Sequence, residues 1–493
     1  MKINKKTNHA KTFMRGSIIS LIGTGLLGLL NYLIRRKLSY SLSLTDFGFI
    51  YGALSLCSIF LAYIDIGLGQ SAIILMSKAA EKKNKAQLNL YYLQYFMIKI
   101  LAASVIFLII AATYNFWVYD FLKYNNITPF FIILSMLFTH SIVSAPSSVI
   151  TALKKFGIFN IGQLMSPIII LIVILMLNPT QNINIYASAF PIAALVGFIF
   201  FFFSASLFGF YPTANSYNAL IKLGPIFHLS KWIAISTLGL TTMYYMDSMM
   251  IIWLDGLKAV ALYSIALPIM QIAQSLMVLP AVFIPIVSGM WQRKEVDQIG
   301  NACSIITEIT IYGFWPILFS IIPASGYLIT LLFPAKYIAA SHALVFLFLG
   351  NIFFSLANFY MGTLNAGKYA KLVALTIIIA SAGNLILNYL LIPYFSINGA
   401  AIATATSYIL ISVCLYFVLY NKLTTFKINF KSLLFPSIIG TICLILTFIS
   451  TDIWNMSLLH AISFVILTNC VYFICSYKKI KYYYSLIMAL IKS

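Results

Sequence analysis

Long apolar runs alternate with short polar breaks along nearly the whole chain. A membrane-spanning helix needs about 20 consecutive apolar residues. Runs near that length predict fourteen transmembrane helices, at residues 15–34, 47–67, 92–114, 128–150, 157–177, 186–208, 232–254, 260–290, 301–322, 342–364, 372–392, 399–420, 432–450 and 457–476. The longest breaks, near 209–231 and 321–341, are too short for a soluble domain. The pattern therefore predicts an all-α, polytopic membrane protein.

Composition agrees with this pattern. Of the 493 residues, 62% are hydrophobic and only 8% are charged, whereas soluble domains contain about 25% charged residues. A water-soluble fold is therefore excluded. The net charge of +21 would suggest a nucleic-acid partner in a soluble protein, but in a membrane protein basic residues first indicate topology, because they concentrate in cytoplasmic loops. We predict no nucleic-acid partner.

The distribution of basic residues predicts that both termini are cytoplasmic. With fourteen spans, the cytoplasmic side receives 24 of the 31 Lys and Arg residues, the other side receives six, and Lys99 lies inside a span. The basic N-terminus precedes an apolar run without a small-residue cleavage site, which predicts a retained helix rather than a signal peptide. We expect a multi-pass protein of the cell (cytoplasmic) membrane.

A faint internal repeat divides the chain. The stretch 151–157, TALKKFG, is echoed by the stretch 363–369, TLNAGKY, and each follows a helix that enters the cytoplasm. This offset of six helices predicts two pseudo-symmetric six-helix halves, at 1–212 and 213–422, with two appended helices and a basic tail at 423–493. Since six is even, the halves share one orientation and can enclose a cavity that opens to either side.

Three stretches carry a family resemblance. Residues 385–406 read LILNYLLIPYFSINGAAIATAT, residues 44–51 read LTDFGFIY ahead of Asp65, and Met246-Asp247-Ser248 is followed by Leu262-Tyr263. These stretches resemble the polysaccharide or O-antigen flippases of the multidrug/oligosaccharidyl-lipid/polysaccharide exporter superfamily. The resemblance covers essentially the whole chain and implies the fold of the multidrug and toxic-compound extrusion (MATE) transporters.

The same region separates the branches of that superfamily. Multidrug exporters usually carry the Gly-Ala-Ala-x-Ala-Thr helix start in both halves and have twelve helices, whereas here it occurs once, at 399–404. Lipid II flippases share the fourteen-helix layout, but the spacing of Asn384, Asn388 and Pro393 resembles the oligosaccharide branch. Pro393 and Gly399 are expected to bracket a tight outer turn, and the alanines that follow to form a small-residue packing face.

Basic residues at membrane depth are the first site candidates, because an ionisable side chain there is costly and is by default a functional hypothesis. If the resemblance holds, the ligand is a sugar chain on a polyprenyl phosphate or diphosphate. Lys99 is the leading candidate for phosphate contact, with Arg35, Arg36 and Lys37 as an outer station. The alternatives are that Lys99 reaches toward an interface and that the outer cluster is an interfacial anchor.

Acidic residues at depth suggest coupling to an ion. Asp247 and Glu308 lie within predicted spans, where they can pair with Lys99 or bind H⁺ or Na⁺. The alternative for both is a static ion pair or polar helix contact. Asp65, at the end of a span, is expected to cap the stretch that follows, with Gly67 permitting a bend.

Neutral polar residues complete the candidate site. Sugars need hydrogen-bond donors and acceptors, which Asn31, Tyr244 and Asn358 offer at membrane depth, although each can equally well join helices. The six cysteines form no Cys-x-x-Cys pair and lie mostly in apolar runs, where a thiol acts as a small hydrophobe. No metal site and no cofactor is predicted.

The function predicted from these observations is transport without covalent chemistry. We expect a flippase that moves a polyprenyl-linked oligosaccharide to the outer leaflet by alternating access. Its expected partners are this substrate, membrane lipids and other polysaccharide-assembly proteins. The alternatives are a cation-coupled multidrug exporter, a lipid II flippase and, least favoured, a membrane glycan polymerase. Polymerases generally have a long outer loop with catalytic acids or arginines, which the sequence lacks.

Overall fold

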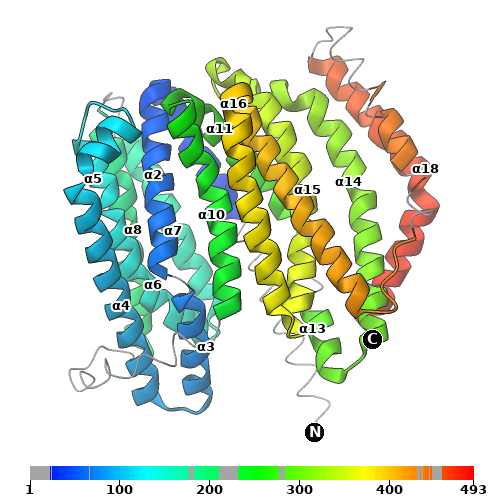
Figure 1. Cartoon of the computed structure of the whole chain (residues 1–493), viewed down its shortest axis with the longest axis horizontal. Helices are drawn as coiled ribbons and strands as arrows, with labels where there is room; N and C mark the ends of the chain where they lie inside the picture. Colours follow the sequence, from blue (N-terminus) through cyan, green and yellow to red (C-terminus); the bar gives the residue numbers. More distant parts are fainter. Residues whose placement is uncertain are drawn as a thin grey trace. The chain divides into compact units, whose positions relative to one another are not determined.

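The computed structural model describes residues 23, 25–65, 67–176, 182–209, 231–276, 284–429, 434, 437–443, 445–446 and 458–492. All regular secondary structure in these residues is helical (Figure 1), so the predicted all-α fold is confirmed. The chain forms two compact units, Met1–Pro268 and Ile269–Ser493. The predicted limit at 212/213 lies outside the described residues, and the three-part division stays a prediction.

The first unit is a bundle of antiparallel helices. After a helix at 25–41, its elements are α2 (Leu44–Asp65), α3 (Leu68–Glu81), α4 (Lys85–Ala112), the π-helix η1 (Phe116–Phe121), α5 (Thr128–Leu134), α6 (Met136–Ala152), α7 (Phe156–Met176), α8 (Ile183–Leu207), α10 (Lys231–Leu254) and α11 (Leu257–Leu276).

The second unit contains the longest helices. Its elements are α13 (Ile284–Arg293), α14 (Val296–Leu332), the 3-10 helix η3 (Ala335–Ala340), α15 (Ser341–Ala366), α16 (Ala370–Lys422) and α18 (Leu458–Lys492). The range of α16 contains two helices joined at Ser396, where φ is 53° and ψ is −133°. This kink lies inside the outer turn predicted between Pro393 and Gly399.

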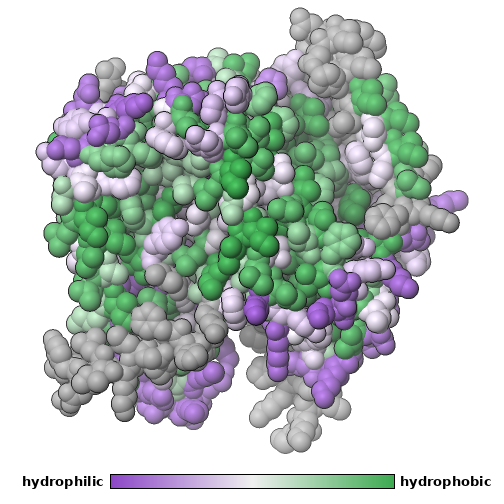
Figure 2. Space-filling view, in the orientation of Figure 1, coloured by the Kyte–Doolittle hydropathy of each residue, from purple (hydrophilic) through white to green (hydrophobic). Residues whose placement is uncertain are grey.

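Several helices are suited to a bilayer. Among the described residues, seven helices are long and apolar enough to cross a membrane, and an eighth is added if the bent α14 counts as one span. The surface over α4 and its neighbours is hydrophobic along the middle of the helices and hydrophilic toward their ends (Figure 2). Large apolar side chains such as Leu101 and Leu108 are exposed there. The chain is therefore a multi-pass membrane protein, while the count of fourteen spans stays a prediction.

Two predicted polar segments are helical. The expected loop at 321–341 is wrong, because α14 continues through Pro316 and Pro323 to Leu332. Its two parts meet at a 49° bend, since proline removes a helical hydrogen bond without ending a helix that is supported within a membrane bundle. Likewise, α18 continues to Lys492 through the basic tail at 477–481.

The predicted small-residue face packs as expected. Ala400, Ala401 and Ala403 of α16 are fully buried. On α15, a side chain at Gly350 would run into the backbone of Ala405 at 2.6 Å, so the two helices approach closely because neither carries bulk there. The predicted residues Asn384 and Asn388 are also buried, and Asn388 donates a hydrogen bond to the Asn384 side chain at 3.2 Å.

Four helices end in the same lysine turn. The residues Lys83, Lys154, Lys294 and Lys368 follow α3, α6, α13 and α15 and have φ between 55° and 67°. Each donates its amide to the carbonyl three residues earlier, and the next amide bonds to the carbonyl five residues earlier, as Lys83 to Ala80 and Asn84 to Ala79 show. This is the Schellman motif, whose left-handed position is usually glycine. Lys154 and Lys368 lie in the two stretches of the sequence echo, in a register shifted by two residues, and the repeat stays a prediction.

Candidate functional site

The candidate site lies at a break between α2 and α3. The helix α2 ends at Asp65, and α3 begins at Leu68 after Gly67, whose φ of 69° is left-handed. A side chain at Gly67 would also collide with Ala234 of α10. Only glycine meets both demands. Gly67 therefore allows the predicted bend between α2 and α3, immediately after Asp65.

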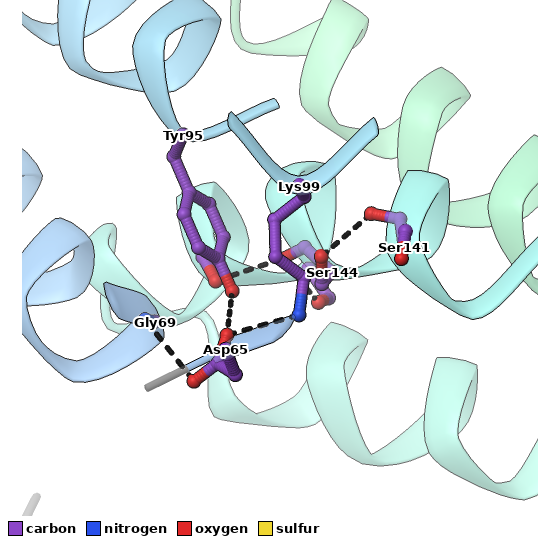
Figure 3. Close-up of polar contacts among 8 residues, drawn as sticks. Asp65, Gly69, Tyr95, Lys99, Ser141 and Ser144 are labelled. Atoms are coloured by element: carbon purple, nitrogen blue, oxygen red, sulfur yellow. Dashed lines mark hydrogen bonds and ion pairs between the residues drawn. The ribbon is translucent and has the colours of Figure 1, made fainter. Parts of the chain in front are cut away.

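Three donors converge on the Asp65 carboxylate (Figure 3). Lys99 Nζ lies 3.0 Å from Oδ1, and the Tyr95 hydroxyl donates to the same oxygen at 2.8 Å. The amide of Gly69, in the first turn of α3, donates to Oδ2 at 3.3 Å. Asp65 therefore caps α3 as expected and also joins it to α4.

The burial of the pair is asymmetric. The Lys99 side chain is 5% exposed, whereas that of Asp65 is 32% exposed. Lys99 is therefore not reaching for an aqueous interface. Tyr95 and Lys99 are four residues apart on α4, so they lie on one helical face and can both donate to a single carboxylate. The anticipated partners of Lys99 were Asp247 and Glu308, but the partner that the structure shows is Asp65.

A row of serines on α6 borders this cluster. Ser144 donates to the carbonyl of Ser141 at 2.6 Å, and Ser148 donates to the carbonyl of Ser144 at 2.7 Å. The Ser141 hydroxyl is buried and makes no hydrogen bond among the described residues. Figure 3 places Ser141 and Ser144 beside Lys99. The site thus combines a buried ammonium with hydroxyl groups, which together suit an anionic, oxygen-rich ligand.

Two residues of the basic cluster on the helix 25–41, Arg35 and Arg36, contact other residues of the first unit. Arg35 donates to the carbonyl of Ser264 on α11 at 2.5 Å, and its guanidinium lies 4.6 Å from the centre of the Tyr51 ring. Arg36 is exposed and lies 6.0 Å from the Tyr40 ring. Arg35 therefore joins helices, whereas Arg36 is accessible for a ligand.

Asp247 lies in the first unit and Glu308 in the second, and each has a hydrogen-bond partner within its own unit. Asp247 is 2% exposed and accepts a hydrogen bond from the Tyr263 hydroxyl at 2.8 Å. Glu308, on α14, accepts the backbone amide of Asn429 at 2.8 Å. One turn earlier on α14, Ser304 accepts the amide of Lys427 at 3.0 Å. Glu308 therefore fastens the segment after α16 to α14.

The three neutral candidates do not gather around Lys99 in the contacts that the structure gives. Asn31 is half-buried and Asn358 is exposed, while Tyr244 packs edge-on against Tyr245 with ring centres 4.9 Å apart. Sequence reasoning missed Tyr95, although its four-residue spacing from Lys99 was a usable signal.

The part of the chain that contains this site matches a known protein family. A model of the family described as polysaccharide biosynthesis protein matches residues 13–291, more than half of the chain. The chain belongs to this family. Residues Asp65, Tyr95 and Lys99 all lie within the matched range. The resemblance to polysaccharide flippases of the exporter superfamily is thereby confirmed.

The individual relatives of this chain are distant. An uncharacterized membrane protein of Methanocaldococcus jannaschii is 24% identical over 434 residues, which cover 84% of this chain and 85% of the relative. Lipid II flippase MurJ, in an inward closed conformation, is similar with a TM-score of 0.73 at 16% identity, over 95% of this chain and 100% of that one. The Vibrio cholerae MATE transporter VcmN has a TM-score of 0.57 at 15% identity, over 85% and 98%. These structures show a shared fold; the first is named a flippase and the second a transporter.

Proposed function

We propose that this protein flips a polyprenyl-phosphate- or diphosphate-linked oligosaccharide from the cytoplasmic to the outer leaflet for the synthesis of a surface glycan. The family membership supports a role in polysaccharide synthesis, and the likeness to MurJ supports a fold that can carry a lipid-linked saccharide. The observation that carries the proposal is the buried ammonium of Lys99 with a partly exposed carboxylate partner.

The chemistry of the Lys99 cluster matches a phosphate head group. Removing an unpaired charge from water costs several kcal/mol, so a buried lysine waiting for an anionic substrate needs a temporary counter-ion. Asp65 supplies one, and its partial exposure leaves it able to withdraw into water. A phosphate that replaces it keeps the charge-assisted hydrogen bonds to Lys99 and Tyr95.

Exchange of the counter-ion would also act on the bend. Asp65 accepts hydrogen bonds from the amide of Gly69 and from Lys99, so its release removes the side-chain contacts that join the end of α2 to α3 and α4. A ligand shifts a conformational equilibrium by its differential affinity for the two states. We therefore propose that phosphate binding favours a second position of α3 as a step of alternating access.

Two further roles follow from the predicted residues. Arg36 is the accessible member of the outer basic cluster and would receive the phosphate after translocation. Asp247, hydrogen-bonded to Tyr263, is the proposed site of H⁺ or Na⁺ coupling. Both termini are proposed to be cytoplasmic, because the distribution of Lys and Arg over the predicted loops then follows the positive-inside rule.

The experiment that tests the function is a deletion of the gene in its native host, complemented with the wild-type chain, Lys99→Ala or Lys99→Arg. Surface glycan is stained, and the leaflet of the accumulated lipid-linked oligosaccharide is determined with an impermeant periodate reagent. Protein level and membrane insertion are measured in parallel.

We expect the deletion and Lys99→Ala to lose surface glycan and to trap intermediates in the cytoplasmic leaflet, with Lys99→Arg retaining part of the activity. Normal export by a fully inserted Lys99→Ala variant would refute the role of Lys99. Unchanged glycan in the deletion strain, together with new sensitivity to cationic drugs, would instead support the multidrug exporter.

A further inference from the structure

An apolar groove lies next to the Lys99 cluster. It encloses about 530 Å³ between α2, α4 and η1, and its lining includes Phe60 and Tyr63 of α2 and Ile106 and Ile109 of α4. Tyr63 and Ile109 are exposed at 44% and 57%, so the groove opens toward the surface that faces lipid. Its floor includes Ile110, which is 1% exposed.

Aromatic rings close one end of this groove. Trp117 of η1 lies 5.7 Å from Phe60, measured between ring centres and edge-on. The Trp117 indole donates to the Thr113 hydroxyl at 3.0 Å, which fixes the plane of the ring. A π-helical turn such as η1 is rare and is found frequently at functional sites. The groove is therefore a shaped surface rather than a random gap between helices.

The groove follows the same face of α4 as the charged cluster. Tyr63 lies two residues before Asp65 on α2, and Ile106 lies seven residues, or about two helical turns, after Lys99 on α4. At 1.5 Å per residue, the stretch from Lys99 to Thr113 spans about 21 Å. A lipid whose phosphate contacts Lys99 would thus meet the apolar groove farther along the same helix.

We propose that this groove binds the isoprenoid tail of the same lipid whose phosphate contacts Lys99; the proposal rests on the proposed function and adds a second point of substrate recognition. Within a bilayer there is no hydrophobic gain in moving a tail from lipid to protein, so selection rests on packing. Methyl-branched isoprene units offer side groups that can pack against the groove-facing surfaces of Phe60 and Trp117, whereas a linear acyl chain lacks them. Contact of the phosphate with Lys99 holds the lipid, and the groove selects isoprenoid tails over linear acyl chains.

The test uses the full chain in phosphatidylcholine nanodiscs. The probe is undecaprenyl phosphate with a diazirine in its tail, and the comparison probe is a dipalmitoyl phosphatidic acid with a diazirine in one acyl chain. After illumination, mass spectrometry locates the labelled peptides. The variant Ile109→Trp fills the groove from its lipid side, and Leu108→Trp is the matched control, because Leu108 is a neighbouring exposed residue of α4 outside the lining.

We expect the undecaprenyl probe to label the segment 106–117, with labelling at least about fivefold weaker in Ile109→Trp because the packing contacts are lost, and unchanged in Leu108→Trp. Equal labelling by the phosphatidic acid probe, or labelling outside this segment only, would overturn the proposal. Persistent labelling of the groove in Lys99→Met would support the groove while counting against the phosphate contact, so the two ideas fail separately.

Discussion

Lys99 and Asp65 lie 3.0 Å apart although 34 positions separate them in the sequence. Their contact joins the middle of α4 to the end of α2, immediately before the bend at Gly67. A buried ion pair contributes little net stability, because desolvation offsets the attraction, but removing one partner leaves an uncompensated charge and is strongly destabilising. The pair is therefore better suited to holding a conformation until a competing anion arrives than to strengthening the fold.

Replacing Asp65 tests this relationship. Asp65→Asn removes the negative charge while keeping the size of the side chain, so Lys99 is left without its counter-ion. We expect the free energy of unfolding to fall by about 1–3 kcal/mol, less than for a fully buried pair because Asp65 is partly exposed. Thermal denaturation of the purified chain in detergent measures the loss.

The double variant is the control for that result. Adding Lys99→Met to Asp65→Asn removes the stranded charge, and we expect it to recover most of the lost stability while leaving export inactive. If the double variant is as unstable as the sum of the two single variants, the side chains are not coupled and the counter-ion model is wrong.

Gly67 should tolerate no side chain. Gly67→Ala places a residue in the left-handed region, at a cost of about 1–2 kcal/mol, and pushes its methyl group into Ala234, which adds about 1–3 kcal/mol. Gly157→Ala is the matched control, because Gly157 lies in the first turn of α7 with no atom within 4 Å of an added Cβ. We expect a lower melting temperature for the first variant and an unchanged or higher one for the second; equal effects would show that the bend is not constrained.

The sequence predicted the helices well because bilayer-spanning runs are defined by composition. The all-α fold, the bend at Gly67, the kink near Ser396 and the packing of the alanines around Ala403 all follow from local residue types. The loop at 321–341 was wrong because α14 runs through Pro323 to Leu332, since proline can bend a helix within a membrane bundle without ending it.

The candidate site was predicted only in part. Lys99 could be singled out because a charge inside an apolar run is conspicuous, but its partner could not, since nothing in the sequence states which face of α4 meets the end of α2. Asp65 was assigned to capping alone, and the Tyr95 hydroxyl was missed because tyrosine is common in this chain. Pairings between distant helices depend on packing, which no local pattern specifies.

Two variants of Glu308 distinguish a structural role of its side chain from a role in ion coupling. Glu308→Gln keeps a side-chain oxygen that can accept the Asn429 amide but cannot titrate, whereas Glu308→Leu removes the acceptor. If the contact is structural, the Gln variant keeps its stability and its transport, and the Leu variant loses about 1–3 kcal/mol because the Asn429 amide is left unsatisfied. Transport in proteoliposomes under imposed proton or sodium gradients decides the matter: a Gln variant that transports equally with and without a gradient would instead establish Glu308 as a coupling residue.

The lysine turns offer the last test, because they place a basic residue where glycine is usual. In Lys368→Gly, relief of the left-handed strain of about 1 kcal/mol is opposed by a gain in unfolded-chain entropy of about 0.4–1 kcal/mol, so we expect stability to change little. Lys368→Val should lower it by more than about 1 kcal/mol, since a β-branched residue with positive φ is a genuine outlier. Lys371→Val, on the exposed first turn of α16, is the control and should cost no more than about 0.7 kcal/mol. Equal losses in the two valine variants would mean that the conformation of Lys368 is not what limits the position. Retention of lysine despite the available glycine then has an electrostatic reason: the side chain lies at the negative end of a helix dipole and adds a positive charge on the side that the positive-inside rule predicts to be cytoplasmic.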